Sequence, residues 1–192
     1  MFFEIDQVLI SRERIAARVR ELAGCLAADL AEQLRCEQSG PGVEGRVVLV
    51  PIMTGAMIFT ADLIREMPIK LSLGLVAVSS YPGESITSKG AHLAGELPRN
   101  LAGKHVVIID DILDSGQTLH LIRKAIIEQQ AASIRICVLL RKQVQRVVDV
   151  TPDYVGFEIP DAFVVGYGLD YDGYYRNYPE IATLKPLALA DR

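Results

Sequence analysis

Hydrophobic positions along the chain change between a helical and a strand-like spacing. After Ser11, which can cap a helix, apolar residues recur at steps of three and four from Ile15 to Leu34, ahead of a Gly/Pro turn at residues 39–42. Runs of mostly apolar residues predict strands at residues 46–50, 70–79, 106–109 and 134–140, and helical spacing predicts helices at residues 56–67 and 117–127. Strands and helices therefore alternate over most of the chain.

This alternation is typical of an α/β fold. Strands that are separated by helices pair in parallel, so we predict a doubly wound, mainly parallel sheet flanked by helices. The segment from Thr151 onward, rich in Pro, Gly and Tyr, departs from this rhythm. We therefore predict a core of residues 1–150, which includes the N-terminal helix, and a small C-terminal hood of residues 151–192.

Composition and charge narrow the choice of partners. A chain of 192 residues, half of them hydrophobic, can bury one sizeable core. The net charge of -4 and the absence of a Lys/Arg block argue against nucleic acid as the main partner. The first residues lack the positively charged region of a signal peptide, and no apolar run approaches membrane-spanning length. We expect a cytoplasmic protein without a membrane or nucleic-acid partner.

Cysteine and histidine give no sign of a metal or redox site. Cys25, Cys36 and Cys137 are widely spaced and form no Cys-x-x-Cys motif, so neither a disulfide framework nor a zinc site is indicated. We expect all three to be reduced core residues. The three histidines stand apart beside apolar residues, and we expect them to be structural.

The most informative motif follows the apolar run at residues 106–109. Asp110, Asp111 and Asp114 fall within five residues, where like charges repel each other unless a cation or a hydroxyl-rich ligand compensates them. The next helix begins with residues whose successive backbone N–H groups can hold a phosphate. These are Ser115, Gly116, Gln117 and Thr118. The segment therefore predicts a site for a phosphorylated sugar, and a solvated acidic turn is the alternative.

The two adjacent acids also set a geometric condition. Neighbouring side chains of a strand point to opposite faces, so Asp110 and Asp111 can serve one ligand only if the strand ends there. We therefore expect a strand that ends at the acids, at the edge of the sheet where α/β proteins bind ligands.

With these residues in place, the chain resembles a known family. Residues 106–118 match the phosphoribosyl-diphosphate signature of the type I phosphoribosyltransferases: four apolar residues, two acids, two apolar residues, Asp, Ser or Thr, Gly, any residue and Thr. Residues 152–161 and 163–171 are similar to the base-binding hood of the hypoxanthine-guanine phosphoribosyltransferases. The resemblance runs, with gaps, from Val47 to Arg176.

The resemblance implies a purine salvage enzyme. Phosphoribosyl diphosphate and hypoxanthine or guanine, both 6-oxopurines, would give IMP or GMP and pyrophosphate with the help of Mg²⁺, in a homodimer or homotetramer. A xanthine-preferring relative is one alternative, because the purine 2-position is read largely by backbone carbonyls. An RNA-binding regulator that keeps the diphosphate site is the other.

On the sugar side, the resemblance implies roles for both acid positions. Asp110 and Asp111 would bind the ribose hydroxyls directly or through the metal, and residues 115–118 would hold the sugar phosphate. Asp114 would lie near N7 of the purine as a general base.

On the pyrophosphate side, the resemblance implies two loops and an arginine. Thr54 and Gly55 follow a strand and open a helix, although relatives usually carry Lys or Arg at the position of Thr54, often after a cis peptide bond. Ser80 and Tyr81 match a pair that closes over pyrophosphate, at the start of a long polar stretch for which a disordered excursion is the alternative. Arg176 would pair with pyrophosphate through its forked guanidinium.

On the base side, the resemblance implies four residues. Lys142 would donate to the 6-oxo group and so reject adenine, Phe163 would stack on the purine, and the backbone of Val164 would hydrogen-bond its edge. Asp170 would hold a metal-bound water, which makes it a metal residue together with Asp110 and Asp111. Without the resemblance, Phe163 is a plain core residue and Lys142 a solvated lysine.

Overall fold

A computed structural model describes residues 2–37, 45–79, 92–93, 97–145 and 147–186. The elements, in chain order, are β1 (Ile5–Ile10), α1 (Arg12–Cys36), β2 (Val47–Met53), α2 (Met57–Arg65), β3 (Ser72–Leu73), β4 (Val76–Ser79), β5 (His92–Leu93), β6 (His105–Leu113), α3 (Gln117–Glu128), β7 (Ser133–Lys142), β8 (Tyr154–Ile159), β9 (Val164–Val165) and β10 (Ile181–Leu184). Ser80 and Tyr81 lie outside the described residues.

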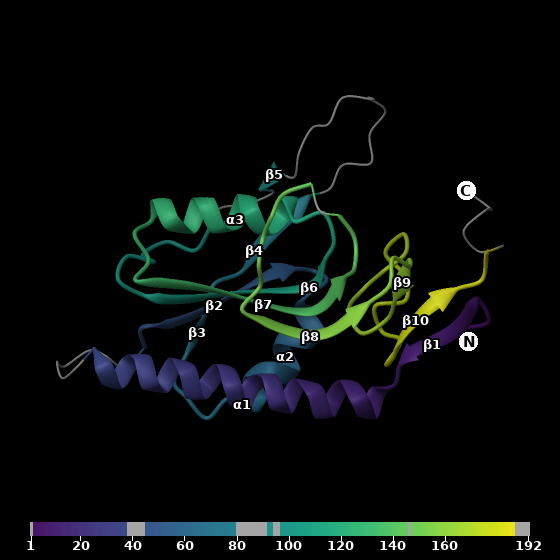
Figure 1. Cartoon of the computed structure of the whole chain (residues 1–192), viewed down its shortest axis with the longest axis horizontal. Helices are drawn as coiled ribbons and strands as arrows, with labels where there is room; N and C mark the ends of the chain where they lie inside the picture. Colours follow the sequence, from purple (N-terminus) through teal and green to yellow (C-terminus); the bar gives the residue numbers. More distant parts are fainter. Residues whose placement is uncertain (1, 38–44, 80–91, 94–96, 146, 187–192) are drawn as a thin grey trace.

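The main sheet has the order β5-β4-β2-β6-β7-β8, and the short strand β3 also pairs with β2. All of its strand pairs are parallel except that of β4 and β5. Helices α1 and α2 cover one face of the sheet and α3 covers the other (Figure 1). The predicted doubly wound α/β fold is confirmed.

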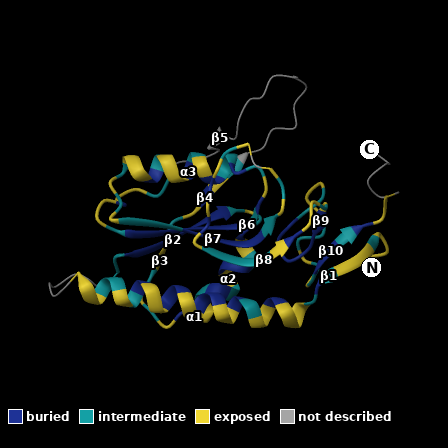
Figure 2. Ribbon diagram, in the orientation of Figure 1, coloured by how far each residue is buried: buried dark blue, intermediate teal, exposed yellow. Residues whose placement is uncertain are grey.

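The central strands are buried on both faces, which explains why they are apolar at nearly every position. In β6, Val107 and Ile109 pack in the hydrophobic cluster that contains α1 and α2, whereas Val106 and Ile108 pack in the cluster that contains α3. Figure 2 shows this burial along β2, β6 and β7, with exposed residues on the outer sides of α1 and α3. The sheet therefore forms a rigid base for the loops at its edge.

Helix α1 follows the predicted pattern. Ser11 is its N-cap and accepts a hydrogen bond from the Arg14 N–H at 3.4 Å. The Arg18 guanidinium donates to the carbonyls of Val155 and Gly156, both at 2.9 Å, and so ties the helix to β8. One expectation about cysteine was wrong: Cys25 and Cys36, on the outer side of α1, are exposed, and only Cys137 is buried.

A second sheet, with the order β1-β10-β9, forms the hood. Its strands are antiparallel, and the two ends of the described chain lie side by side in it (Figure 1). The predicted boundary at residue 150 does not separate the two sheets, because β8 pairs with β7 in the main sheet while β1, from the N-terminal part, pairs with β10. The hood is thus built from both ends of the chain.

Three predicted element boundaries were wrong. Strand β2 continues through Met53 into the predicted loop of residues 51–55. The predicted strand at residues 70–79 is divided into β3 and β4, with Gly74 and Leu75 between them, and Gly74 lies so close to Pro98 that a Cβ would be 2.4 Å from its Cγ. Strand β6 does not end at the acids but runs to Leu113, which pairs with Arg141 of β7.

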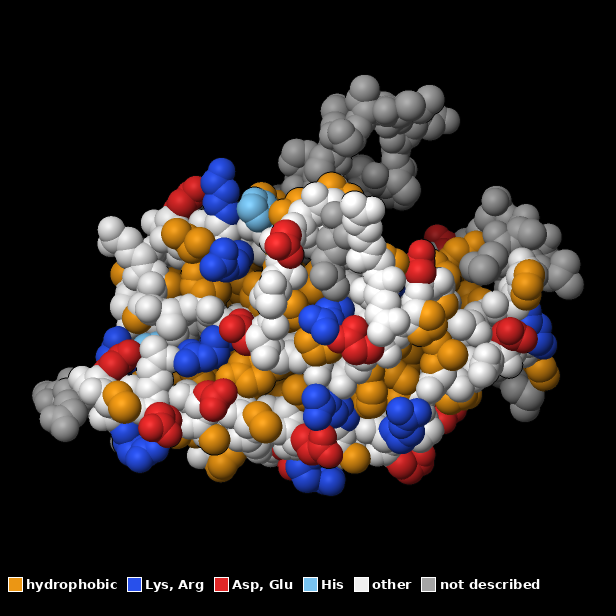
Figure 3. Space-filling model, in the orientation of Figure 1, with side chains coloured by type: hydrophobic (Ala, Val, Ile, Leu, Met, Phe, Trp, Pro, Cys, Tyr) orange, Lys and Arg blue, Asp and Glu red, His pale blue; other side chains and the backbone are white. Residues whose placement is uncertain are grey.

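The outer surface carries both signs of charge. On the face of the molecule shown in Figure 3, Lys and Arg side chains are interspersed with Asp and Glu side chains. Among the described residues, no helix is both long enough and apolar enough to cross a lipid bilayer.

Candidate active site

A cavity of about 510 Å³ opens at the carboxyl ends of β2 and β6. It brings together most of the residues predicted to contact the sugar and pyrophosphate, together with the predicted general base Asp114 and the predicted metal residue Asp170. These are Thr54, Gly55, Asp110, Asp111, Asp114, Ser115, Gly116, Thr118, Asp170 and Arg176. Gln117, also predicted, begins α3 without lining the cavity.

A smaller cavity of about 210 Å³ adjoins the first. Asp111, Asp114 and Asp170 line both cavities. The smaller cavity is completed by the residues predicted to hold the base: Lys142, Phe163 and Val164. A ligand in one cavity therefore lies next to a ligand in the other, with the carboxylate of Asp114 at their border.

The Asp110 and Asp111 pair is held by its own backbone. The Asp111 N–H donates to Oδ1 of Asp110 at 3.1 Å, and the Ile112 N–H donates to Oδ1 of Asp111 at 2.9 Å. Although β6 continues past both residues, both line the larger cavity, so the condition that the strand must end there was wrong. Room for the Asp111 carboxylate comes from Gly55, where a Cβ would lie 2.0 Å from its Oδ2.

Burial makes two negative charges at this position unfavourable. Desolvation raises the pKa of Asp110 well above its usual value, and the charge of Asp111 raises it further. Desolvation also raises the pKa of Asp111, although hydrogen bonds to its carboxylate and the charge of Arg176 oppose the change. A cation or a set of hydroxyl donors in the cavity would remove this penalty.

The start of α3 is shaped to hold an anion. Gly116 occupies the N-cap with a φ of 81° and has no side chain to accept the first N–H groups of the helix. A Cβ on Gly116 would lie 2.6 Å from the carbonyl oxygen of Val148, whose own N–H donates to the Ser115 carbonyl at 3.2 Å. A ligand phosphate can take the place of the missing cap.

Arg176 and Asp170 form one unit at the hood side of the cavity. Nη2 of Arg176 lies 2.7 Å from Oδ1 of Asp170, and its Nη1 donates to the Gly168 carbonyl at 2.6 Å. The Gly173 N–H donates to the other carboxylate oxygen of Asp170 at 2.8 Å. This fixes the guanidinium with its charge toward the cavity.

In the smaller cavity, Lys142 lies between two carboxylates. Its Nζ is 3.0 Å from Oδ2 of Asp114 and 3.3 Å from Oδ1 of Asp161. Partial burial works against the ammonium charge, but the two carboxylates outweigh it and raise the pKa of Lys142. The side chain is only 13% exposed, so the alternative of a freely solvated lysine is wrong.

Phe163 is not a core residue. It is 46% exposed, and its ring meets Tyr171 edge-on with centroids 5.5 Å apart. An exposed aromatic face in the wall of a cavity is available to stack on a planar ligand. The alternative of a plain core role for Phe163 was therefore wrong.

The chain is similar in sequence to known proteins. The family model described as "Phosphoribosyl transferase domain" matches residues 20–172. The hypoxanthine-guanine phosphoribosyltransferase of Bacillus subtilis is 38% identical over 97% of this chain and 97% of its own length. The chain belongs to the hypoxanthine-guanine phosphoribosyltransferase family. A relative of the same name from Streptococcus pneumoniae is 36% identical over 95% of this chain and 94% of its own.

Solved structures of the family agree with the fold. A hypoxanthine phosphoribosyltransferase of Trypanosoma cruzi, 34% identical, superposes with a TM-score of 0.88 and covers 100% of this chain and 97% of its own. One from Staphylococcus aureus, 36% identical, gives a TM-score of 0.84 and covers 98% and 96%. The similarity therefore extends over core and hood together.

Two features of the site bear on expectations drawn from this family. The Met53–Thr54 peptide bond is cis, as the resemblance implied. Thr54 lines the cavity without a charge, so Arg176 provides the positive charge on this side among the described lining residues.

The sequence did not predict residues that position the side chains or loops of the site without being assigned a ligand contact. Asp161 contacts Lys142, and Gly168 brings the hood against the loop after β2, since a Cβ there would lie 2.2 Å from the Gly55 carbonyl oxygen. The flanking glycines of Gly166-Tyr167-Gly168 were the available signal for such a close approach.

Proposed function

We propose that this protein transfers the phosphoribosyl group of phosphoribosyl diphosphate to N9 of hypoxanthine or guanine, which gives IMP or GMP and pyrophosphate. The observation that carries the proposal is the pair of adjoining cavities with Asp114 at their border. One cavity has an anion-binding helix start and two acids, and the other has a lysine and an exposed aromatic ring. This combination suits a phosphorylated sugar beside a planar base with a carbonyl group.

The residues divide the chemistry between them. As pyrophosphate leaves C1 of the ribose, positive charge grows on the sugar ring and negative charge on the leaving group. Asp110 and Asp111 accept hydrogen bonds from the ribose hydroxyls, and Arg176 faces the leaving group. Asp114 accepts the proton at N7 of the purine, a form of help that contributes a factor of roughly 10² to 10⁴ in such reactions.

Magnesium fits the donor set. Among the described residues, no three His, Cys, Asp or Glu side chains gather closely enough to hold a metal ion by themselves. Asp110, Asp111 and Asp170 instead line one cavity, and Mg²⁺ is usually bound by one or two carboxylates together with substrate phosphates and water. Burial raises the pKa of both acids, and a cation bound beside them would favour their ionised forms. When bound, Mg²⁺ would neutralise charge on the diphosphate.

Lys142 selects the base. Because its pKa is raised, the ammonium keeps all of its hydrogens and can only donate. A 6-oxo group accepts such a hydrogen bond, whereas the 6-amino group of adenine presents another donor. Phe163 stacks on the purine and the Val164 backbone contacts its edge, since both line the cavity that contains Lys142.

The relatives described above favour this reading over its two alternatives, a xanthine-preferring enzyme and an RNA-binding regulator. Their names state hypoxanthine or hypoxanthine-guanine phosphoribosyltransferase. We also propose a homodimer or homotetramer in the cytoplasm, which sedimentation and cell fractionation can test. Ser80 and Tyr81 remain proposed contacts of pyrophosphate.

A single set of assays tests the proposed function. Product formation is measured with hypoxanthine, guanine, xanthine and adenine, each with Mg²⁺ and with EDTA, and RNA retention is measured on filters in parallel. We expect turnover with hypoxanthine or guanine, none with adenine, and a loss of turnover in EDTA. Faster turnover with xanthine would support the first alternative, and RNA binding without any turnover would support the second.

A further inference from the structure

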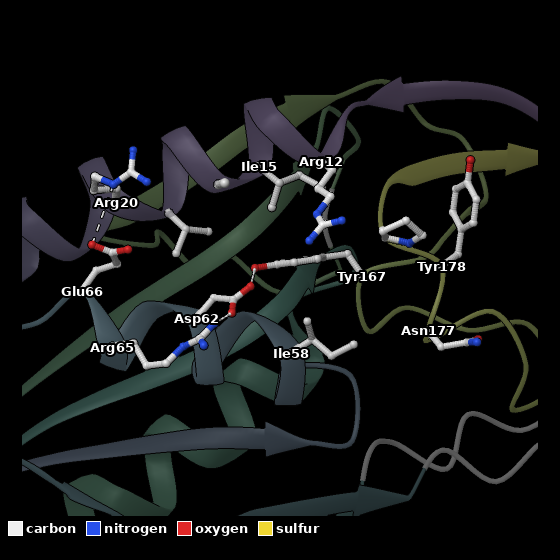
Figure 4. A pocket seen from close by; sticks show the side chains of 13 residues that line it. Arg12, Ile15, Arg20, Ile58, Asp62, Arg65, Glu66, Tyr167, Asn177 and Tyr178 are labelled. Carbon is white, nitrogen blue, oxygen red and sulfur yellow. Dashed lines mark hydrogen bonds and ion pairs between the residues drawn. The ribbon is translucent and has the colours of Figure 1, made fainter.

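Tyr167 joins the hood to helix α2 from behind the active site. Its side chain is buried, with 7% of the residue exposed, and lines neither of the two site cavities. Its hydroxyl donates to Oδ2 of Asp62 at 2.6 Å. Figure 4 shows Tyr167 reaching from the hood toward Asp62, in the wall of a separate cavity of about 480 Å³.

The backbone at Tyr167 has a conformation that its residue type does not favour. Its φ is 48°, and the residues on either side, Gly166 and Gly168, have φ values of 97° and 107°. A bulky residue in the left-handed region carries a conformational cost, and glycine or asparagine would suit this position better. The side chain must therefore contribute contacts that outweigh this cost.

The segment that Tyr167 anchors carries the hood side of the active site. The Gly168 N–H donates to the Arg176 carbonyl at 3.0 Å, and the Gly168 carbonyl accepts from the Arg176 guanidinium. Arg176 in turn pairs with Asp170. Displacement of residues 166–168 would therefore move both functional side chains.

Asp62 belongs to helix α2, which follows the loop on the opposite side of the active site. Helix α2 begins at Met57, whose N–H donates to the Thr54 carbonyl at 3.1 Å. Gly55, two residues before Met57, is the residue whose carbonyl oxygen lies close to Gly168. The bond between Tyr167 and Asp62 thus connects the two walls of the pyrophosphate end of the cavity on the side away from the ligand.

We propose that Tyr167 is a positioning residue, whose hydroxyl holds the hood segment on α2 so that Arg176 and the loop at Thr54 face pyrophosphate at the correct spacing. The inference rests on the proposed function and deepens it. The hydroxyl can be removed without leaving a charge unpaired, because the Asp62 carboxylate also forms an ion pair with Arg65.

Tyr154 provides the matched control. Its hydroxyl also donates to a carboxylate, Oδ2 of Asp29 at 2.5 Å, and also connects a strand to a helix, β8 to α1. Neither residue lines the active-site cavities. Tyr167→Phe and Tyr154→Phe therefore remove the same kind of bond, and only the first should affect the site.

The test measures steady-state kinetics and, by calorimetry, the Kd of phosphoribosyl diphosphate with Mg²⁺. For Tyr167→Phe we expect the KM and Kd for phosphoribosyl diphosphate to rise about three- to tenfold. The KM for hypoxanthine should stay within about twofold, because the base cavity keeps its residues. If Tyr167 had only a structural role, Tyr167→Phe would lower the melting temperature and the active fraction, and the constants for phosphoribosyl diphosphate and hypoxanthine would not change differently.

Asp62→Ala removes the acceptor of the same hydrogen bond. It replaces Tyr167→Phe as the test variant if Tyr167→Phe folds poorly. We expect a similar rise in both constants, although Asp62→Ala also removes the ion pair with Arg65. Adding Tyr167→Phe to Asp62→Ala should give no further rise, because the hydroxyl has already lost its partner. Unchanged constants in folded Tyr167→Phe or Asp62→Ala, or an equal rise in Tyr154→Phe, would overturn the proposal. Absence of wild-type turnover would instead refute the proposed function, and the Kd comparison would still decide the role of Tyr167.

Discussion

At the scale of single residues, the acid pair of β6 is expected to favour ligand binding and to lower the stability of the ligand-free protein. Asp110 is buried beside Asp111, and both lie in a cavity that a ligand with hydroxyl groups or a cation would fill. Without such a ligand, the folded protein must carry a carboxylate in a place that favours its protonated form. The residue is therefore expected to reduce stability in the free protein and to support binding.

Asp110→Asn should stabilise the ligand-free protein at neutral pH. A carboxyl group whose pKa is raised on folding stabilises the protein only while it is protonated, so stability falls as pH rises from its ordinary value of 3.8 through the raised one. The amide keeps the acceptor for the Asp111 N–H without the charge. Thermal unfolding in EDTA at pH 7.5 should show a gain of at least about 2 °C, and a smaller gain at pH 4.5. A lower melting temperature at pH 7.5 would contradict the account.

Asp114→Asn should separate catalysis from binding. The amide can still accept a hydrogen bond from Lys142, but it cannot accept a proton from the purine. We expect kcat to fall roughly 10²- to 10⁴-fold, with a change in the Kd of phosphoribosyl diphosphate below about threefold. Asp149→Asn, at an exposed acid outside both cavities, is the control. Equal losses of binding and turnover would make Asp114 structural.

Most of the residues that line the larger cavity could be predicted from the sequence, because they belong to one continuous motif. Asp110 through Thr118 lie in one strand-turn-helix segment, and the structure places all of them except Gln117 around one cavity. Asp161 and Tyr167 could not be predicted in the same way. Their effect depends on partners distant in sequence, Lys142 and Asp62, which only the folded chain brings near.

At the scale of elements, the start of α3 combines two requirements in one glycine. Gly116 needs a positive φ, and it also needs the space that a side chain would take from the Val148 carbonyl. As a result the N-cap residue offers no side-chain acceptor to the helix, and among the described residues only the first N–H, that of Gln117, has a side-chain partner, Ser115 Oγ at 3.5 Å.

Gly116→Ala should weaken the binding of phosphoribosyl diphosphate as well as lower the stability of the protein. Gly103→Ala is matched to it, since Gly103 has a φ of 67° and nothing within 4 Å of an added Cβ. We expect Gly103→Ala to cost about 1 to 2 kcal/mol of stability because of the left-handed backbone. Gly116→Ala should cost more, because its Cβ would also lie 2.6 Å from the Val148 carbonyl oxygen. Only Gly116→Ala should raise the Kd of phosphoribosyl diphosphate, by about tenfold or more, measured by calorimetry. A similar Kd in both variants would argue against the phosphate site at this turn.

Element types could be predicted from hydrophobic spacing, whereas several boundaries could not. Strand β6 runs through Asp110 and Asp111 because the backbone of β7 continues beside it to Arg141, and this pairing is not visible in the sequence of β6. The break between β3 and β4 falls at Gly74 and Leu75, and the close contact of Gly74 with Pro98 joins residues that are distant in sequence.

At the scale of the whole molecule, core and hood meet across the site. Asp110 lies in the main sheet and Thr54 directly after its strand β2, whereas Asp170 and Arg176 come from the segment between β9 and β10. The main sheet could be predicted because its elements follow one another in sequence. The hood sheet could not, because it needs pairing between β1 and β10 and includes a strand of two residues.

A ligand that contacts both parts should stabilise the entire fold. At a concentration of 100 times its Kd, phosphoribosyl diphosphate with Mg²⁺ adds about 2.7 kcal/mol, which for a protein of this size raises the melting temperature by about 5 to 10 °C. Ribose 5-phosphate lacks the diphosphate. At the same concentration and with Mg²⁺, it should raise the melting temperature by less. Equal shifts would show that the Arg176 side of the cavity contributes no binding.

The pairing of β1 with β10 has a consequence for how the protein is made. During translation β1 is made before the strands of the main sheet, and its partner β10 is made only after all of them. The main sheet can assemble in the meantime from consecutive segments. Nascent chains arrested before residue 181 should therefore contain a protease-resistant core with an unpaired β1, and they should lack activity until β10 is available to complete the second sheet.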